Sequence, residues 1–221
     1  MNCSCHDFGG AVERQFDEQI AARDLKSYRA KGPGATTRLL RDGLKQAGRL
    51  DGILLDIGSG VGALTFELLD AGATRAIDVD ASAAYVAAAS HEAARRGKTE
   101  AIQFIRADFI SAAAKIPPAA IVTLDRVVCC YPESRPLLAE GVRHAERLFG
   151  FSYPRDLWPV RIWNIVINAK RRFTGNPFRT YIHPATDMAQ IIREAGFDLV
   201  HRRVTWVWCV DVYARVASQS K

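Results

Sequence analysis

The sequence predicts an α/β fold built on a mostly parallel sheet. Three neighbouring observations carry this prediction, and all lie between residues 52 and 69. The apolar run at residues 53–55 is typical of a strand buried inside a parallel sheet. Glycine then occupies every second position, and the segment after it has the composition and apolar spacing of a helix. The order strand, glycine loop, helix aims backbone N–H groups and a helix N-terminus at a ligand.

The loop contains Gly58, Ser59, Gly60 and Gly62, and Asp56 lies shortly before it. Glycine lets the backbone turn sharply and approach a ligand with no Cβ in the way. A dinucleotide fingerprint stays open, because that pattern tolerates alanine in place of its last glycine. A P-loop is excluded, since no Lys-Ser or Lys-Thr pair follows. Glycines that serve the turn alone are the less favoured interpretation.

Length and composition restrict the class of protein. The chain has 221 residues, enough for one α/β domain with a sizeable core. No run of about 18 apolar residues occurs, so we expect no membrane-spanning helix. The N-terminus is too polar for a signal peptide, and an odd number of cysteines, five, indicates free thiols in the cytoplasm. The net charge of +6 is typical of a solvated basic face, but also suits an anionic substrate, nucleic acid or membrane surface.

The N-terminal region is predicted to be a mobile tail over residues 1–10 and a helical cap over residues 11–50. Cys3, Cys5 and His6 form a C-x-C-H pattern with no second cluster nearby, so we expect no metal site.

Within the cap, apolar spacing predicts helices over residues 11–31 and 36–50, with a break at residues 31–34. Such a cap would bring Tyr28 and Lys31 close to a ligand below it. Contact with the ligand and a surface or packing role are equally compatible with the sequence at Tyr28 and Lys31.

Acidic residues follow the next strands. The second strand covers residues 75–79, and Asp80 lies about 20 residues beyond the glycine loop, where a carboxylate can accept hydrogen bonds from a ribose diol. Asp78 would lie deeper in the strand, so we assign the ribose contact to Asp80. The third strand covers residues 102–105 and leads to Asp108, for which a helix N-cap is the alternative role.

The remaining elements follow from periodicity and turn residues. We predict a helix over 82–96, a fourth strand over 120–124, a helix over 134–149, a fifth strand over 151–155, a helix over 186–194, and two final strands over 197–203 and 205–214. A helical insert at about residues 156–178 mixes apolar and basic side chains. Packing against the sheet edge is its default role, but it also suits capping of an apolar substrate or peripheral membrane contact through residues 156–173.

From about residue 10 to residue 215, the chain resembles the class I S-adenosylmethionine-dependent methyltransferases. The G-x-G-x-G spacing with an aspartate before it is similar to their first motif. The nearest pattern is that of the magnesium-protoporphyrin O-methyltransferases, on the stretches Leu124–Pro132 and Arg179–His183. The resemblance implies a Rossmann-like methyltransferase domain over residues 51–221, with a mostly parallel seven-stranded sheet, helices on both faces and an antiparallel C-terminal edge.

The resemblance also implies roles for individual residues. Asp108 would accept a hydrogen bond from the adenine amino group, and Phe109 would offer a backbone N–H or an apolar face. Tyr131 and His183 would face the substrate and Cys130 would line its pocket, although a plain loop role for His183 is weighted equally. The residues expected to hold S-adenosylmethionine are Asp56, Gly58, Ser59, Gly60, Gly62, Asp80, Asp108, Phe109, Asp125, Tyr28 and Lys31.

Two departures from the family bear on the substrate. The family tends to have a histidine where this chain has Cys130, and a tyrosine where it has Gln15. That histidine would be a natural general base near neutral pH. Because a carboxylate or phenolate needs no strong base, we predict O-methylation of a small or medium-sized apolar molecule, with carboxylate-bearing acceptors included. Motifs of base-modifying methyltransferases are absent, so Cys129 and Cys130 are not expected to be nucleophiles.

Three other functions remain as alternatives. They are an RNA methyltransferase, a non-catalytic binding protein with the same fold, and an NAD-dependent oxidoreductase. We expect a small-molecule substrate rather than a nucleic acid, and the sequence leaves the oligomeric state open.

Overall fold

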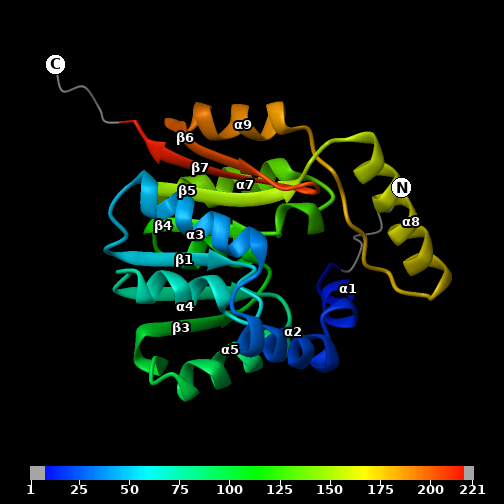
Figure 1. The fold of residues 1–221 in the computed structure, drawn as a ribbon, viewed down its shortest axis with the longest axis horizontal. Helices are drawn as coiled ribbons and strands as arrows, with labels where there is room; N and C mark the ends of the chain where they lie inside the picture. Colours follow the sequence, from blue (N-terminus) through cyan, green and yellow to red (C-terminus); the bar gives the residue numbers. More distant parts are fainter. Residues whose placement is uncertain (1–7, 217–221) are drawn as a thin grey trace.

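A seven-stranded sheet forms the centre of the computed structural model, which describes residues 8–216. The strand order is β3-β2-β1-β4-β5-β7-β6, and β7 runs antiparallel to both of its neighbours (Figure 1). The mostly parallel sheet with an antiparallel C-terminal edge is therefore confirmed. The strands are β1 (Ile53–Ile57), β2 (Arg75–Asp80), β3 (Ile102–Arg106), β4 (Ala119–Asp125), β5 (Ala145–Pro154), β6 (Phe197–Val204) and β7 (Trp208–Arg215).

Helices cover both faces of the sheet. On one face α3 packs on β5 and β7, α4 on β1 and β2, and α5 on β2 and β3; on the other, α7 packs on β4 and β5 and α9 on β6. The helices are α1 (Phe8–Gln15), α2 (Glu18–Lys31), α3 (Ala35–Ala47), α4 (Ala63–Asp70), α5 (Ala83–Arg95), α6 (Phe109–Ala112), α7 (Ser134–His144), α8 (Trp158–Phe173) and α9 (Ala185–Glu194), with 3-10 turns η1 (Thr99–Ala101), η2 (Ala113–Lys115) and η3 (Val128–Cys130).

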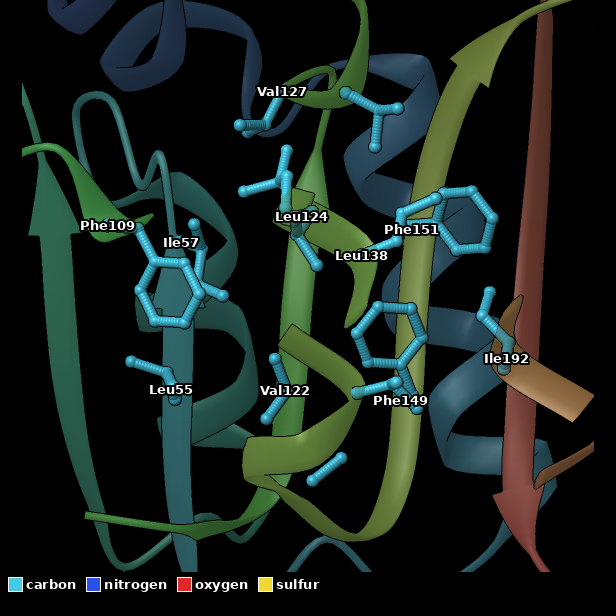
Figure 2. Packing of buried hydrophobic residues seen from close by; sticks show 14 of the residues in the cluster. Leu55, Ile57, Phe109, Val122, Leu124, Val127, Leu138, Phe149, Phe151 and Ile192 are labelled. Carbon is cyan, nitrogen blue, oxygen red and sulfur yellow. The ribbon is translucent and has the colours of Figure 1, made fainter. Parts of the chain in front are cut away.

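The sheet separates two apolar cores. In β1, Leu54 packs with the helices of the first face, whereas Leu55 and Ile57 belong to the cluster on the other face, as the alternation of a strand requires. Figure 2 shows this second cluster, which β1, β4 and β5 share with Leu138 and Ile192. Burial on both faces explains why the central strands are mostly apolar and why the first was recognisable from sequence.

Helix α3 lies very close to the sheet because glycine stands at the contact. A Cβ on Gly150 would lie 2.8 Å from Leu40 Cδ1, and one on Gly43 would lie 2.6 Å from His201 Cδ2. The same helix presents Thr37 to the carboxyl edge of the sheet, so this close packing helps to position a residue of the site described below.

The predicted boundary between α7 and β5 is wrong. The helix ends at His144, and residues 145–149 begin β5 instead of extending the helix. The buried His144 ring contacts the carbonyl oxygens of Glu140 at 2.7 Å and Ala113 at 3.0 Å, which satisfies polar groups at the helix end. The apolar residues at 145 and 148 have helical spacing, and β5 accommodates both because it is buried on its two faces, so the pattern alone favoured the helix.

The predicted helix over residues 11–31 is two helices. Asp17 begins α2, because its carboxylate accepts a hydrogen bond from the backbone N–H of Ile20 at 2.9 Å. The first helix begins at Phe8, so residues 8–10 are helical and not part of the expected tail. Cys3, Cys5 and His6 lie outside the described residues.

The insert does not pack against the sheet edge by its apolar side, as its default role required. Helix α8 stands away from the body of the molecule, and Val160 is its only buried residue (Figure 1). Between residues 8 and 216, no helix has both the length and the apolar character needed to cross a membrane.

Candidate active site

A cavity of about 720 Å³ lies at the carboxyl ends of β1, β2 and β4. The strand order reverses between β1 and β4, and open α/β sheets bind ligands at such a point. Residues from α1, α2 and the segment 171–180 also line the cavity, so the N-terminal helices and the insert both contribute to its walls.

The cavity brings together most of the predicted site residues. Gly62, Asp108 and His183 are not among the lining residues. Those that line it are Tyr28, Lys31, Asp56, Gly58, Ser59, Gly60, Asp80, Phe109, Asp125, Cys130 and Tyr131.

Glycine is required at each of the three loop positions for a different structural reason. All three have positive φ, at 68° for Gly58, 57° for Gly60 and 75° for Gly62. A Cβ on Gly58 would lie 2.4 Å from Val127 Cγ2, so this glycine allows the loop to contact the segment after β4. A Cβ on Gly60 would meet no atom within 4 Å, which leaves the backbone there open to the cavity. Gly62 serves the turn into α4.

Asp80 ends β2 and holds the glycine loop. Its Oδ2 accepts a hydrogen bond from Gly60 N at 2.9 Å, and its Oδ1 accepts one from Ser82 N at 2.8 Å. Burial raises the pKa of Asp80 to about 6, although both hydrogen bonds oppose that rise. Each carboxylate oxygen has a second lone pair, so Asp80 can also accept hydrogen bonds from a ligand.

Asp56 lies deeper and shares a threonine with Asp78. Asp56 Oδ1 accepts from Thr123 Oγ1 at 2.7 Å, while Thr65 Oγ1 lies 3.1 Å from Asp56 Oδ2 and 2.6 Å from Asp78 Oδ1. Thr65 has one hydroxyl hydrogen, so one of the two carboxyl groups must be protonated to make both contacts. Burial raises the pKa of Asp56 to about 7 and that of Asp78 well above its ordinary value. Asp78 does not line the cavity, in agreement with the preference for Asp80.

Asp125 ends β4 and receives two hydroxyl groups. Ser152 Oγ donates to its Oδ1 and Thr37 Oγ1 to its Oδ2, both at 2.6 Å. Asp125 therefore has a fixed orientation. Within residues 8–216, neither Asp56, Asp80 nor Asp125 forms an ion pair. Asp80 and Asp125, with a partly ionised Asp56, give this part of the cavity a preference for cationic ligand groups.

Of the two residues predicted to contact adenine, Phe109 lines the cavity and Asp108 does not. Asp108 caps α6 by accepting from Ser111 N at 3.1 Å, and its other oxygen accepts from Tyr131 Oη at 2.5 Å. The alternative role of Asp108 as an N-cap is therefore present in the structure. Phe109 packs beside His144 and belongs to the apolar cluster of Figure 2, and it is also among the residues that line the cavity.

The predicted substrate residues leave no general base in the cavity. The Tyr131 hydroxyl donates to Asp108, and burial raises the pKa of Tyr131 well above its usual value, so the phenol stays neutral. Burial and the hydrogen bond with Cys129 raise the pKa of the Cys130 thiol, which lies 3.7 Å from the Arg126 carbonyl oxygen.

The structure places His183, which is predicted to face the substrate, beside Tyr131. Its Nε2 lies 3.0 Å from the Tyr131 carbonyl oxygen, outside the cavity lining. This contact, together with the hydrogen bond from Tyr181 N to Cys129 O at 2.8 Å, connects the segment after α8 to the loop after β4. His183 therefore lies beside a loop that lines the cavity, and both of the roles considered for it stay predictions.

The two predicted residues from the cap both border the cavity. The Tyr28 hydroxyl points to Glu67 at 3.4 Å, and its ring lies against Phe66 and under the Arg96 guanidinium. Burial raises the pKa of Tyr28 to about 12. Tyr28 thus has a packing role beside any contact to a ligand, whereas Lys31 is exposed at the end of α2.

Four arginines, Arg23, Arg38, Arg126 and Arg171, line the cavity, and sequence reasoning assigned none of them to the site. Arg126 has φ 63° and is the one non-glycine residue with positive φ in the described chain. Arg171 lies over the Phe178 ring at 5.0 Å and donates to Thr180 Oγ1 at 3.2 Å. Neither guanidinium forms an ion pair within residues 8–216, and both line the cavity. The position of Arg126 directly after a strand end was an available signal, but nothing distinguished Arg171 from its basic neighbours.

Comparison with known proteins agrees with this geometry. Residues 54–147 match the family model described as a methyltransferase domain. No curated protein sequence matches the chain.

Solved structures share the fold at low sequence identity. Magnesium protoporphyrin IX methyltransferase from Synechocystis PCC 6803 with bound SAH gives a TM-score of 0.69 at 20% identity, over 95% of this chain and 100% of that one. An O-methyltransferase family protein from Burkholderia thailandensis gives 0.70 at 13% identity, over 95% and 64%. Human N-acetylserotonin methyltransferase in complex with SAM gives 0.67 at 15% identity, over 97% and 61%.

The sheet order distinguishes this fold from the dinucleotide-binding fold that the glycine loop left open. A dinucleotide-binding sheet has the order 3-2-1-4-5-6, whereas here an antiparallel β7 lies between β5 and β6. The chain therefore has the fold of the class I methyltransferases, and its residues 54–147 match a methyltransferase domain.

Proposed function

We propose that this enzyme transfers a methyl group to an oxygen atom of a small or medium-sized apolar molecule that carries a carboxylate. The observation that carries the proposal is the composition of the cavity wall. Acidic groups on the strand ends suit a cationic cofactor. Arg126 and Arg171, which like Arg38 have no ion-pair partner in the described chain, suit an anionic acceptor.

The residues present fit S-adenosylmethionine. Asp80 would accept hydrogen bonds from the ribose hydroxyls while it holds the Gly60 N–H. The open backbone at Gly60 would allow the methionine portion to approach closely, and Asp56 and Asp125 would favour its positive charges. The cofactor supplies an electrophilic methyl group on its sulfonium. Phe109, Tyr28 and Lys31 stay assigned to this ligand as predictions.

The acceptor is inferred from the predicted substrate residues that line the cavity, neither of which is a base near neutral pH. Among the described residues, no histidine lines the cavity, Tyr131 is neutral, and Cys130 has a raised pKa. A carboxylate is already ionised at neutral pH, so it needs no proton acceptor before it attacks a methyl group. Arg126 and Arg171 would hold the acceptor by charge-assisted hydrogen bonds, and the cavity would exclude water from the reacting atoms.

Methyl transfer to carboxylic acids tests this proposal. Purified protein is titrated with S-adenosylmethionine by calorimetry and then incubated with the methyl-labelled cofactor and a panel of apolar carboxylic acids. We expect label in a methyl ester, which alkaline hydrolysis releases as methanol. Label that resists alkali would point to transfer to nitrogen, carbon or an ether oxygen, and label in added RNA would favour the RNA alternative. An Asp80→Asn variant is the control for cofactor-dependent labelling.

A further inference from the structure

Helix α8 carries an apolar face that points into solvent. We call this surface the α8 apolar face, and its members are between 52% and 90% exposed. On a helical projection they share one side, because they recur at intervals of three or four residues. The α8 apolar face consists of Trp158, Ile162, Trp163, Ile165, Val166 and Phe173.

The polar side of α8 is bound to the protein, which fixes the rotation of the helix. Asn164 Nδ2 and Asn168 Nδ2 donate to the Thr180 carbonyl oxygen at 3.0 and 2.7 Å. Thr180 N donates to Asn168 Oδ1 at 3.0 Å in return. Turning the apolar side inward would break all of these hydrogen bonds, so the exposed orientation is built into the fold.

Basic side chains accompany this face. The sequence from residue 158 to residue 173 contains no acidic residue. Lys170 and Arg172 are exposed and form no ion pair with any part of the chain between residues 8 and 216, while Arg161 pairs with Asp156. The helix therefore combines an apolar stripe, two tryptophans and unneutralised positive charge.

We propose that the α8 apolar face docks on the surface of an anionic lipid bilayer, with the helix lying in the interface. Tryptophan suits the boundary between acyl chains and headgroups, and basic residues beside an apolar stripe suit anionic headgroups. A second copy of the chain fits less well, since face-to-face packing would bring Lys170 and Arg172 of both copies together without acidic partners. The proposal is independent of the methyl acceptor.

Vesicle sedimentation with the full chain tests the docking surface. We expect wild-type protein to sediment with vesicles of phosphatidylcholine and phosphatidylglycerol, with a blue shift of tryptophan fluorescence. The double variant Trp163→Gln and Ile165→Gln should lower the partition coefficient about tenfold, because two large apolar side chains no longer enter the interface. The matched control is Val200→Gln, which changes a side chain that is 50% exposed on β6 and should bind as wild type does.

A second pair of changes tests the charge. Lys170→Gln with Arg172→Gln should weaken binding to the anionic vesicles, and high salt should weaken wild-type binding likewise. Absence of wild-type sedimentation would overturn the proposal. A dimer that forms without vesicle binding, and that the double variant abolishes, would assign the face to a second copy. Calorimetric binding of S-adenosylmethionine by the double variant shows that it is folded and separates this test from that of the proposed function.

Discussion

At the scale of single residues, we expect Asp80 to make cofactor binding dependent on pH. Its pKa is raised to about 6 by burial, so lowering the pH from 7 to 5 converts most of the carboxylate to the neutral acid. A neutral carboxyl group accepts fewer hydrogen bonds, and we expect about tenfold weaker S-adenosylmethionine binding at pH 5 than at pH 7. Calorimetric titration across this range measures the effect. Asp80→Asn should bind weakly at every pH, and equal affinity of wild type at both pH values would contradict the assigned role.

Arg126 should affect stability and activity in opposite directions. Its φ of 63° costs about 1 kcal/mol in a non-glycine residue, so Arg126→Gly should raise the free energy of unfolding by about that amount. The same variant removes a cation from the cavity, and we expect KM for a carboxylate acceptor to rise about tenfold or more. Urea unfolding and initial rates measure the two effects.

The control for this variant is Arg135→Gln, an exposed arginine outside the cavity lining, which should leave both quantities near the wild-type values. An unchanged KM in Arg126→Gly would remove Arg126 from the acceptor site.

At the scale of elements, two glycines of one loop should fail in different ways. Gly58→Ala places a Cβ 2.4 Å from Val127 Cγ2 at positive φ, so we expect a loss of about 2 kcal/mol or more in unfolding free energy. Gly60→Ala meets no atom within 4 Å and should cost about 1 kcal/mol from its φ alone, yet it should weaken cofactor binding more. Denaturant unfolding and calorimetry separate the outcomes, and equal behaviour of both variants would refute the distinction.

The elements also differ in how far they could be predicted from the sequence. Asp80 and the glycine loop were predictable because strand, turn and acid follow one another locally. The end of α7 was not, since Ala145 and Leu148 keep helical spacing although they lie on opposite faces of β5. The cavity position of Arg171 and the outward orientation of α8 depend on hydrogen bonds with Thr180, a contact between segments that no local pattern encodes.

At the scale of the whole molecule, buried carboxyl groups set the pH dependence of stability. Raised pKa values, about 7 for Asp56 and about 6 for Asp80, mean that the folded chain binds more protons than the unfolded chain between pH 4 and pH 7. These two groups therefore stabilise the ligand-free fold at low pH, and that contribution is lost as the pH rises through 6 and 7.

Glu92 has the opposite effect on the pH dependence of stability. It is fully buried against Arg29, Arg95 and Arg96, which hold its pKa well below the usual range, so its contribution is lost as the pH falls below about 4. We expect the melting temperature of the ligand-free protein to be highest near pH 5 and to fall toward pH 7.5, as measured by calorimetry at fixed ionic strength. Asp56→Asn should flatten the decline; a melting temperature that rises steadily to pH 7.5 would contradict this account.

The hydrogen bonds from Asn164 and Asn168 to Thr180 link the outer side of α8 to the cavity. One turn of the helix places Arg171 in the cavity wall, and the opposite side of that turn faces away from the molecule. Because these hydrogen bonds connect α8 to the segment after it, a displacement of the outer side of α8 would also move the Arg171 guanidinium. The affinity for the acceptor would then depend on what α8 contacts. At low substrate concentration, the turnover rate would differ between protein in free solution and protein bound to a surface.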